Sequence, residues 1–99
     1  MKDRLTLSGP ARADLLEIWL FVAADSTTAA DRLLDRIQRR CEGLARMPRL
    51  GRLRPDLAPD IRSFAVGRYL VLYREAKGGG IDVARVRAGE MDLPRLFQQ

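Results

Sequence analysis

Arginine is the residue type whose placement in this chain could do chemistry, because its guanidinium group makes paired hydrogen bonds to phosphate or carboxylate. Sixteen of the eighteen basic residues are arginine, and the formal net charge is +5. Between Arg46 and Arg74 there are seven arginines and only two acidic residues, Asp56 and Asp60. This regional positive charge predicts a surface that attracts an acidic partner.

The 99 residues include no histidine, and this absence limits the chemistry that the chain can perform. Histidine is the usual general base near neutral pH. Without it there can be no Ser-His-Asp triad, no Cys-His pair and no zinc site of the common Cys/His kind. Any catalysis would depend on Arg, Lys, Tyr, Asp or Glu, and we expect neither a metal nor a cofactor.

A β-hairpin is expected to position three of the arginines. The segment from Arg62 to Arg74 holds two strand-like runs separated by Gly67, a residue that permits a tight turn. Arg62, Arg68 and Arg74 then fall at strand ends or faces, where a rigid sheet can present them to a polyanion or an acidic protein. Tyr69 and Tyr73 lie on the same face of the strand, so both are expected to pack in the sheet.

Two helices are expected before the hairpin. Ser8-Gly9-Pro10 is a helix start signal, and the apolar residues Leu15, Ile18, Trp19 and Val22 follow at helical spacing. After a break at residues 25–28, a second amphipathic helix has its apolar positions at Ala30, Leu33, Leu34, Ile37, Cys41, Leu44 and Ala45. Cys41 should therefore be a buried structural thiol. The polar face of this helix carries both signs of charge, and we interpret it as a solvated surface.

A first strand is expected at Arg4 to Ser8 and a last strand at Ile81 to Arg87. Within the last strand Ile81 and Val83 share one face while Val86 falls on the other, so either both faces are covered or a bulge shifts the register. The predicted order is β-α-α-β-β-β. It describes one α+β domain over residues 1–99, an antiparallel sheet covered on one face by an antiparallel helical hairpin.

The remaining expectations concern location and the C-terminal tail. The apolar stretch from Leu15 to Ala24 is shorter than the roughly 20 residues that a membrane span needs, and no signal peptide is visible, so we expect a cytoplasmic protein. The tail carries Leu93, Leu96 and Phe97 almost to its last position. These side chains either dock on the sheet or form part of a partner site.

Four segments in series carry a resemblance to a known family: Pro10-Ala11-Arg12-Ala13-Asp14-Leu15 with Ile18-Trp19; Ala29-Ala30-Asp31-Arg32-Leu33; Pro48-Arg49-Leu50-Gly51-Arg52; and Arg62-Ser63-Phe64 with Gly67-Arg68-Tyr69-Leu70 and Tyr73-Arg74. Together they resemble the RelE/ParE toxins of type II toxin-antitoxin systems, and the ParE branch most closely. The resemblance covers nearly the whole chain. It implies the same β-α-α-β-β-β layout and neutralisation by a ParD-like antitoxin in a hetero-oligomeric complex.

Two activities are implied by this resemblance. ParE-like members poison DNA gyrase, whereas RelE-like members cleave mRNA in the ribosomal A site. Ribonuclease members place basic residues on the last strands, where this chain has Arg85 and Arg87, and a Tyr or His near the C-terminus, where it has Ala88. Glu90 is a poor proton donor at its ordinary pKa. The sequence therefore favours gyrase inhibition, with ribosome-dependent mRNA cleavage as the alternative.

Partner sites are expected on two surfaces. Trp19, Leu20 and Phe21 cannot all face one core, which predicts an exposed apolar strip for the antitoxin on the first helix. The expected antitoxin contacts are Leu15, Leu16, Trp19, Leu20, Leu33, Arg49, Arg52 and Arg54. The expected contacts to the cellular target are Arg62, Arg68, Arg85, Arg87, Leu96 and Phe97.

A plain nucleic-acid-binding module is a third hypothesis, and only the basic charge supports it. In the sequence pattern no helix is basic on one face with a spare recognition surface. No stacking aromatic residues alternate with the arginines, as single-strand binders require. We therefore expect no specific nucleic-acid binding by the chain alone.

Overall fold

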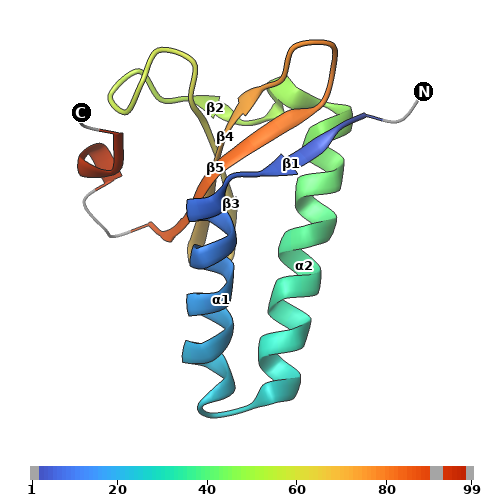
Figure 1. The fold of residues 1–99 in the computed structure, drawn as a ribbon, viewed down its shortest axis with the longest axis vertical. Helices are drawn as coiled ribbons and strands as arrows, with labels where there is room; N and C mark the ends of the chain where they lie inside the picture. Colours follow the sequence, from blue (N-terminus) through green and yellow to red (C-terminus); the bar gives the residue numbers. More distant parts are fainter. Residues whose placement is uncertain (1–2, 90–92, 98–99) are drawn as a thin grey trace.

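The computed structural model describes residues 3–89 and 93–97, which form a five-stranded sheet and two long helices (Figure 1). Two short 3-10 helices, η1 and η2, complete the fold. The elements in chain order are β1 (Leu5–Leu7), α1 (Gly9–Ala23), α2 (Thr27–Arg46), η1 (Pro48–Leu50), β2 (Arg52–Leu53), β3 (Arg62–Val66), β4 (Tyr69–Glu75), β5 (Ile81–Ala88) and η2 (Leu93–Phe97). The predicted α+β class and element order are confirmed.

The sheet is mixed rather than wholly antiparallel. Its strand order is β1-β5-β4-β3-β2, and β1 pairs parallel to β5 while the other neighbours are antiparallel. The expected hairpin is present, with Gly67 at a φ of 61° in its turn. Two features were absent from the expectation: the parallel pairing of β1, and the two-residue strand β2, which lies between the second expected helix and the expected hairpin.

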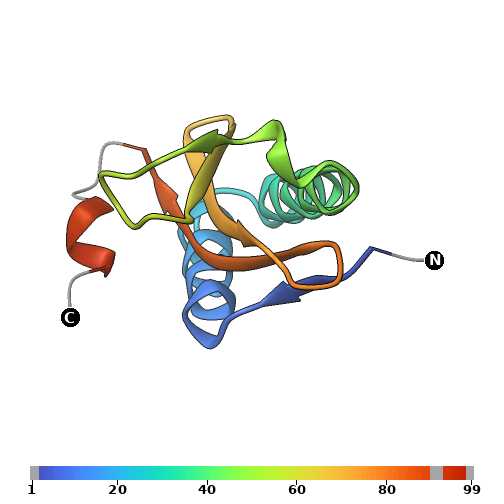
Figure 2. The same cartoon turned by 90° about the horizontal axis from the view of Figure 1, so that it is seen from above.

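The two helices lie side by side and pack on one face of the sheet (Figures 1 and 2). The hydroxyl groups of Ser8 and Ser26 cap their N-termini by accepting hydrogen bonds from the backbone N–H groups of Ala11 and Ala29. The predicted apolar stripe of α2 is the buried one, and burial raises the pKa of the Cys41 thiol to about 11. No helix in the described ranges is both long and apolar enough for a membrane span.

The opposite face of the sheet is also covered. In β4, Val71 and Tyr73 belong to the core under the helices, whereas Leu72 packs with Leu57, Ile61 and Leu93 in a second cluster on the other side. Leu96 and Phe97 pack against this second cluster, so this part of the tail docks on the sheet. Docking was one of the two arrangements expected from the sequence.

A β-bulge in β5 explains its imperfect alternation. Leu72 pairs with Arg85 and Tyr73 pairs with Val83, which leaves Ala84 as the additional residue. The bulge allows Val83 and Val86 to enter the same core under the helices. The sequence allowed either a bulge that shifts the register or a sheet covered on both faces. The structure has the bulge, and the second cluster also covers the other face.

The loop after α2 is held by the hydroxyl group of Tyr73. This hydroxyl donates to the carbonyl oxygen of Pro48 at 2.7 Å and accepts a hydrogen bond from the N–H of Gly51 at 2.8 Å. Arg62 donates to the carbonyl oxygen of Gly51 at 2.8 Å. The backbone of η1 and its connection to β2 is thereby fixed, although its side chains project into solvent.

The close approach at Gly51 gives a stability prediction. A Cβ atom at this position would lie 2.3 Å from the Tyr73 hydroxyl oxygen, so Gly51→Ala should lower the free energy of unfolding by about 1–3 kcal/mol. The matched control is Gly43→Ala within α2, where an added Cβ meets no close neighbour. Alanine is more favourable than glycine inside a helix, so this variant should raise the free energy of unfolding by about 0.5–1 kcal/mol. Urea unfolding measures both, and equal effects would contradict the contact argument.

Candidate functional site

Asp14 joins α1 to the last strand at the point where β1 stops. β1 pairs with residues 81–83 only, and beyond them the Asp14 carboxylate accepts a hydrogen bond from the backbone N–H of Val86 at 3.0 Å. The same carboxylate accepts two hydrogen bonds from Arg85, at 2.8 and 2.9 Å, and one from Arg87 at 3.0 Å. Asp14 is 4% exposed. One carboxylate therefore fixes two of the expected target-binding arginines.

The ionised state of Asp14 is stabilised by these contacts. Burial by itself would raise the pKa of this carboxyl, but the hydrogen bonds from Arg85, the Val86 N–H and Arg87 outweigh it and lower the pKa below its ordinary value. In return, the bonded carboxylate raises the pKa of Arg85. Both arginines keep about a fifth of their side-chain surface exposed, 23% for Arg85 and 18% for Arg87.

Of the other expected target residues, Leu96 and Phe97 line one hollow together with Arg85. Arg62 and Arg68 are not part of that lining. Arg62 is directed at the loop backbone, where it bonds to the carbonyl oxygen of Gly51. Arg68 is exposed in the turn between β3 and β4. Leu96 and Phe97 are half-buried on the second cluster. Glu90, considered above as a proton donor, lies outside the described residues.

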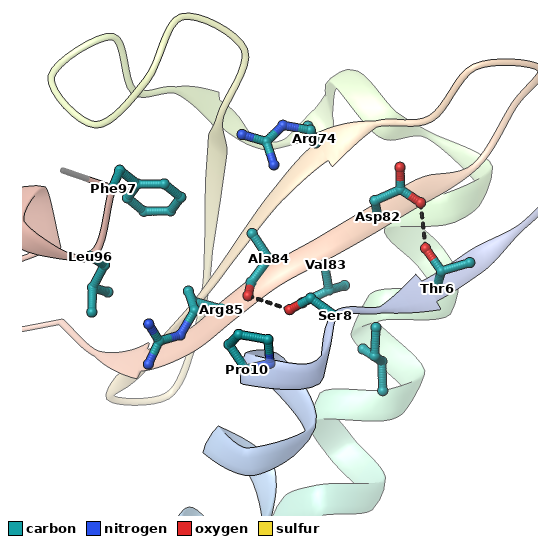
Figure 3. Close-up of a pocket in the computed structure, with 11 residues that line it drawn as sticks. Thr6, Ser8, Pro10, Arg74, Asp82, Val83, Ala84, Arg85, Leu96 and Phe97 are labelled. Carbon is teal, nitrogen blue, oxygen red and sulfur yellow. Dashed lines mark hydrogen bonds between the residues drawn. The ribbon is translucent and has the colours of Figure 1, made fainter. Parts of the chain in front are cut away.

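An open hollow of about 460 Å³ lies beside Leu96 and Phe97 on the sheet (Figure 3). Two arginines line it, and each is already bonded to a carboxylate: Arg74 to Asp60 at 2.9 Å, and Arg85 to Asp14. The lining includes no tyrosine. The hollow is thus suited to holding a partner side chain, and its lining also holds the carboxyl group of Asp82, which accepts a hydrogen bond from the Thr6 hydroxyl.

The expected antitoxin residues of α1 and α2 differ in exposure. Leu16 and Leu20, one turn apart, are 59% and 57% exposed, and Phe21 is 70% exposed. Leu15 and Leu33 are half-buried against the core. Trp19 is also half-buried, and its indole N–H donates to Asp31 of α2 at 2.8 Å. Leu16 and Leu20 therefore form the open apolar strip of α1, while Trp19 links the two helices.

A second exposed apolar group lies on the loop, and sequence reasoning missed it. Met47, Leu50 and Leu53 are 61%, 56% and 49% exposed and alternate with arginines. Of the three loop arginines that were predicted, Arg49 and Arg52 are exposed, and Arg49 lies 3.5 Å from the Glu75 carboxylate. The third, Arg54, is half-buried and makes paired hydrogen bonds to Asp56.

Asp14 is the important residue that sequence reasoning passed over. The signal was present, because Ala11, Asp14 and Ile18 lie at i, i+3 and i+7 and are the buried residues of α1. A carboxylate on the buried stripe of a helix requires a cationic or N–H partner.

Asp14→Asn should lower the free energy of unfolding by about 2–4 kcal/mol at pH 7, because two arginines and an N–H lose a charged acceptor. The pKa of Asp14 in the folded protein lies below its ordinary value of 3.8. The stabilisation from its ionised carboxylate is therefore complete above pH 3.8 and is lost as the pH falls through the folded-state pKa. The difference from wild type should therefore shrink below about pH 4. The control is Asp35→Asn, an exposed helix pair, with an expected loss under about 0.5 kcal/mol. A difference that is constant across the pH range would contradict the assignment.

Comparison with known proteins places this architecture in a family. Residues 5–93 match the family model described as the ParE toxin of the type II toxin-antitoxin system parDE. The chain is 34% identical to Toxin ParE1 of Mycobacterium tuberculosis over 101 aligned positions, covering 96% of this chain and 98% of that protein. It is also 34% identical to Toxin ParE3 of Caulobacter vibrioides, covering 91% and 90%.

A solved structure of a chromosomal ParDE toxin-antitoxin system from P. aeruginosa shares the fold. One of its chains superposes with a TM-score of 0.71 at 24% identity, covering 87% of this chain and 95% of that one. The resemblance inferred from the four sequence segments is confirmed by the family match and by both relatives. This chain belongs to the ParE toxin family of type II toxin-antitoxin systems.

Proposed function

We propose that a ParD-like antitoxin neutralises this toxin by covering the α1 strip of Leu16 and Leu20 and the exposed loop around Arg49 and Arg52. The observation that carries the proposal is the exposure of Leu16 and Leu20, 59% and 57%, on a helix whose opposite side is already packed. Exposed leucines one turn apart are the usual anchors for an apolar partner segment. The P. aeruginosa structure is of a ParDE system, which supports the same class of partner.

The loop supplies a second part of the proposed antitoxin surface. Met47, Leu50 and Leu53 are exposed next to Arg49 and Arg52, so an antitoxin segment that combines acidic and apolar residues would match it. The hydrogen bonds of Tyr73 hold this backbone in place before binding, which reduces the entropy lost in the complex.

We further propose that the free toxin acts by binding DNA gyrase and not by cleaving RNA. Binding needs a surface and no proton donor, and the described residues offer such a surface at the hollow beside Leu96 and Phe97. Tyr73 is buried with its hydroxyl fully engaged, and burial raises its pKa, so it is withdrawn from acid-base chemistry.

The antitoxin site can be tested by replacing both strip leucines with aspartate. Burial of each leucine is worth roughly 1.5–3 kcal/mol, so Leu16→Asp/Leu20→Asp should weaken antitoxin binding at least about 100-fold. The control is Thr28→Asp/Ala29→Asp, which adds the same charge at exposed positions in the first turn of α2, where acids suit the helix dipole. Copurification and calorimetry measure the effect. Unchanged binding by the leucine variant would contradict the assignment.

The gyrase proposal can be tested with purified toxin, gyrase, ATP and supercoiled plasmid. Linear plasmid is expected, with a known gyrase poison as positive control. Phe97→Ala, in the lining of the hollow, should reduce the linear product about tenfold, as loss of one aromatic interface contact does. Arg12→Ala, an exposed arginine of α1, should not. Intact plasmid together with codon-specific mRNA cuts in a translating extract would instead support the ribosome-dependent alternative.

A further inference from the structure

The solvent-facing side of α2 carries a stripe of arginines that neither the antitoxin surface nor the gyrase surface uses. Five arginines of this helix are exposed: Arg32, Arg36, Arg39, Arg40 and Arg46. With about 100° per residue, they fall within an arc of about 120° opposite the buried Ile37 and Cys41. From the first to the last, the stripe is about 21 Å long. We define these five residues as the α2 arginine stripe.

The acidic residues of α2 lie to one side of the stripe, and each has a partner. Asp31 accepts the indole hydrogen bond of Trp19, so the acidic flank faces α1. Asp35 pairs with Arg39 at 2.9 Å, and Glu42 accepts a hydrogen bond from Gln38 at 3.1 Å. The sequence pattern indicated that no helix is basic on one face, and for α2 this was wrong, because its charges separate into an arginine stripe and an acidic flank.

Within the described chain, four arginines of the stripe have no charged partner. The side chains of Arg32, Arg36, Arg40 and Arg46 make no hydrogen bond or ion pair with any residue in the ranges 3–89 and 93–97. Arg36 also lies against the β3–β4 turn, where its guanidinium group would be within 3.6–3.9 Å of a Cβ at Gly67. The stripe thus continues toward the turn that bears Arg68.

The composition of the stripe distinguishes between an acidic protein and a nucleic acid. Protein interfaces need an apolar centre, and the exposed large apolar residues of the described chain, Leu16, Leu20, Phe21, Met47, Leu50 and Leu53, all lie outside α2. Contacts to a phosphate backbone need only suitably spaced cations, and arginine is the best suited. A rigid helix bearing arginines along about 21 Å matches the backbone over about six base pairs.

We propose that the α2 arginine stripe binds the phosphate backbone of duplex DNA without reading its sequence. The arginines would contact phosphate groups and not base edges, so the binding would not depend on the DNA sequence. The antitoxin strip on α1 and the stripe on α2 use different residues, so the proposal goes beyond neutralisation and stands without it. It also stands without gyrase, since the duplex alone is the ligand.

The experiment uses the purified full chain and a fluorescent duplex DNA of mixed sequence, with anisotropy measured over a series of salt concentrations. Four phosphate contacts predict a slope of about −3.6 for log K against log salt concentration. Arg32→Gln/Arg36→Gln/Arg40→Gln should bring that slope to about −0.9 and weaken binding at low salt at least about tenfold. The same three positions changed to lysine should retain most of the slope, because the charge remains.

A control variant separates the stripe from the net charge of the protein. Arg4→Gln/Arg12→Gln/Lys77→Gln removes the same charge from three exposed positions on other parts of the fold, and its slope should stay within about 1 of wild type. Circular dichroism verifies that each variant folds. Equal losses in both glutamine variants, no DNA binding by wild type, or displacement of the duplex by polyglutamate at lower charge concentration would each overturn the proposal. The last result would identify the stripe as a surface for an acidic protein.

Discussion

The hydrogen bonds of the Asp14 carboxylate are the interaction on which the rest of the structure depends. β1 accompanies β5 for three residues, and α1 must then leave the sheet while the edge of β5 continues. Ser8 begins the transition, because its hydroxyl donates to the carbonyl oxygen of Ala84 and caps α1. Asp14 completes it by accepting the N–H of Val86. A helix thereby takes over from a strand as the partner of the sheet edge, and unpaired backbone groups are avoided.

The fold was largely predictable wherever its signal is local. The core stripe of α2 and the turn at Gly67 follow from helical periodicity and backbone preference, and each lies at the position predicted for it. The capping serines, Ser8 and Ser26, lie within the helix start signal at residues 8–10 and the break at residues 25–28. The parallel pairing of β1 with β5 was not predictable, because it joins residues more than seventy positions apart. β2 was missed because two residues between a 3-10 helix and a proline have no periodicity to detect.

The candidate site was predicted less completely, since an arginine gives no sequence signal of whether it is paired. Arg85 reaches a carboxylate 71 positions away, and Arg62 bonds to the backbone of the loop after α2, 11 positions away. The exposed strip of Leu16 and Leu20, which we propose as the apolar half of the antitoxin surface, was easier to predict, because the apolar residues of α1 exceed what one helix face can bury. Trp19 was assigned to that surface by the same reasoning, yet its indole N–H gave it a partner on α2.

The arginines of this chain therefore divide by what their neighbours provide. Three arginines each bind a carboxylate, so the loop and the sheet are fixed by pairs whose charges cancel: Arg54, Arg74 and Arg85. Most of the stripe on α2 has no such neighbours among the described residues, because the helix places its acids on the flank toward α1. Arginines that are paired with a carboxylate make a rigid surface whose structure depends weakly on salt concentration. Exposed arginines without a carboxylate partner make a surface whose affinity for a polyanion falls steeply as the salt concentration rises. A small basic domain can in this way carry one surface for a folded partner and another for a polyanion.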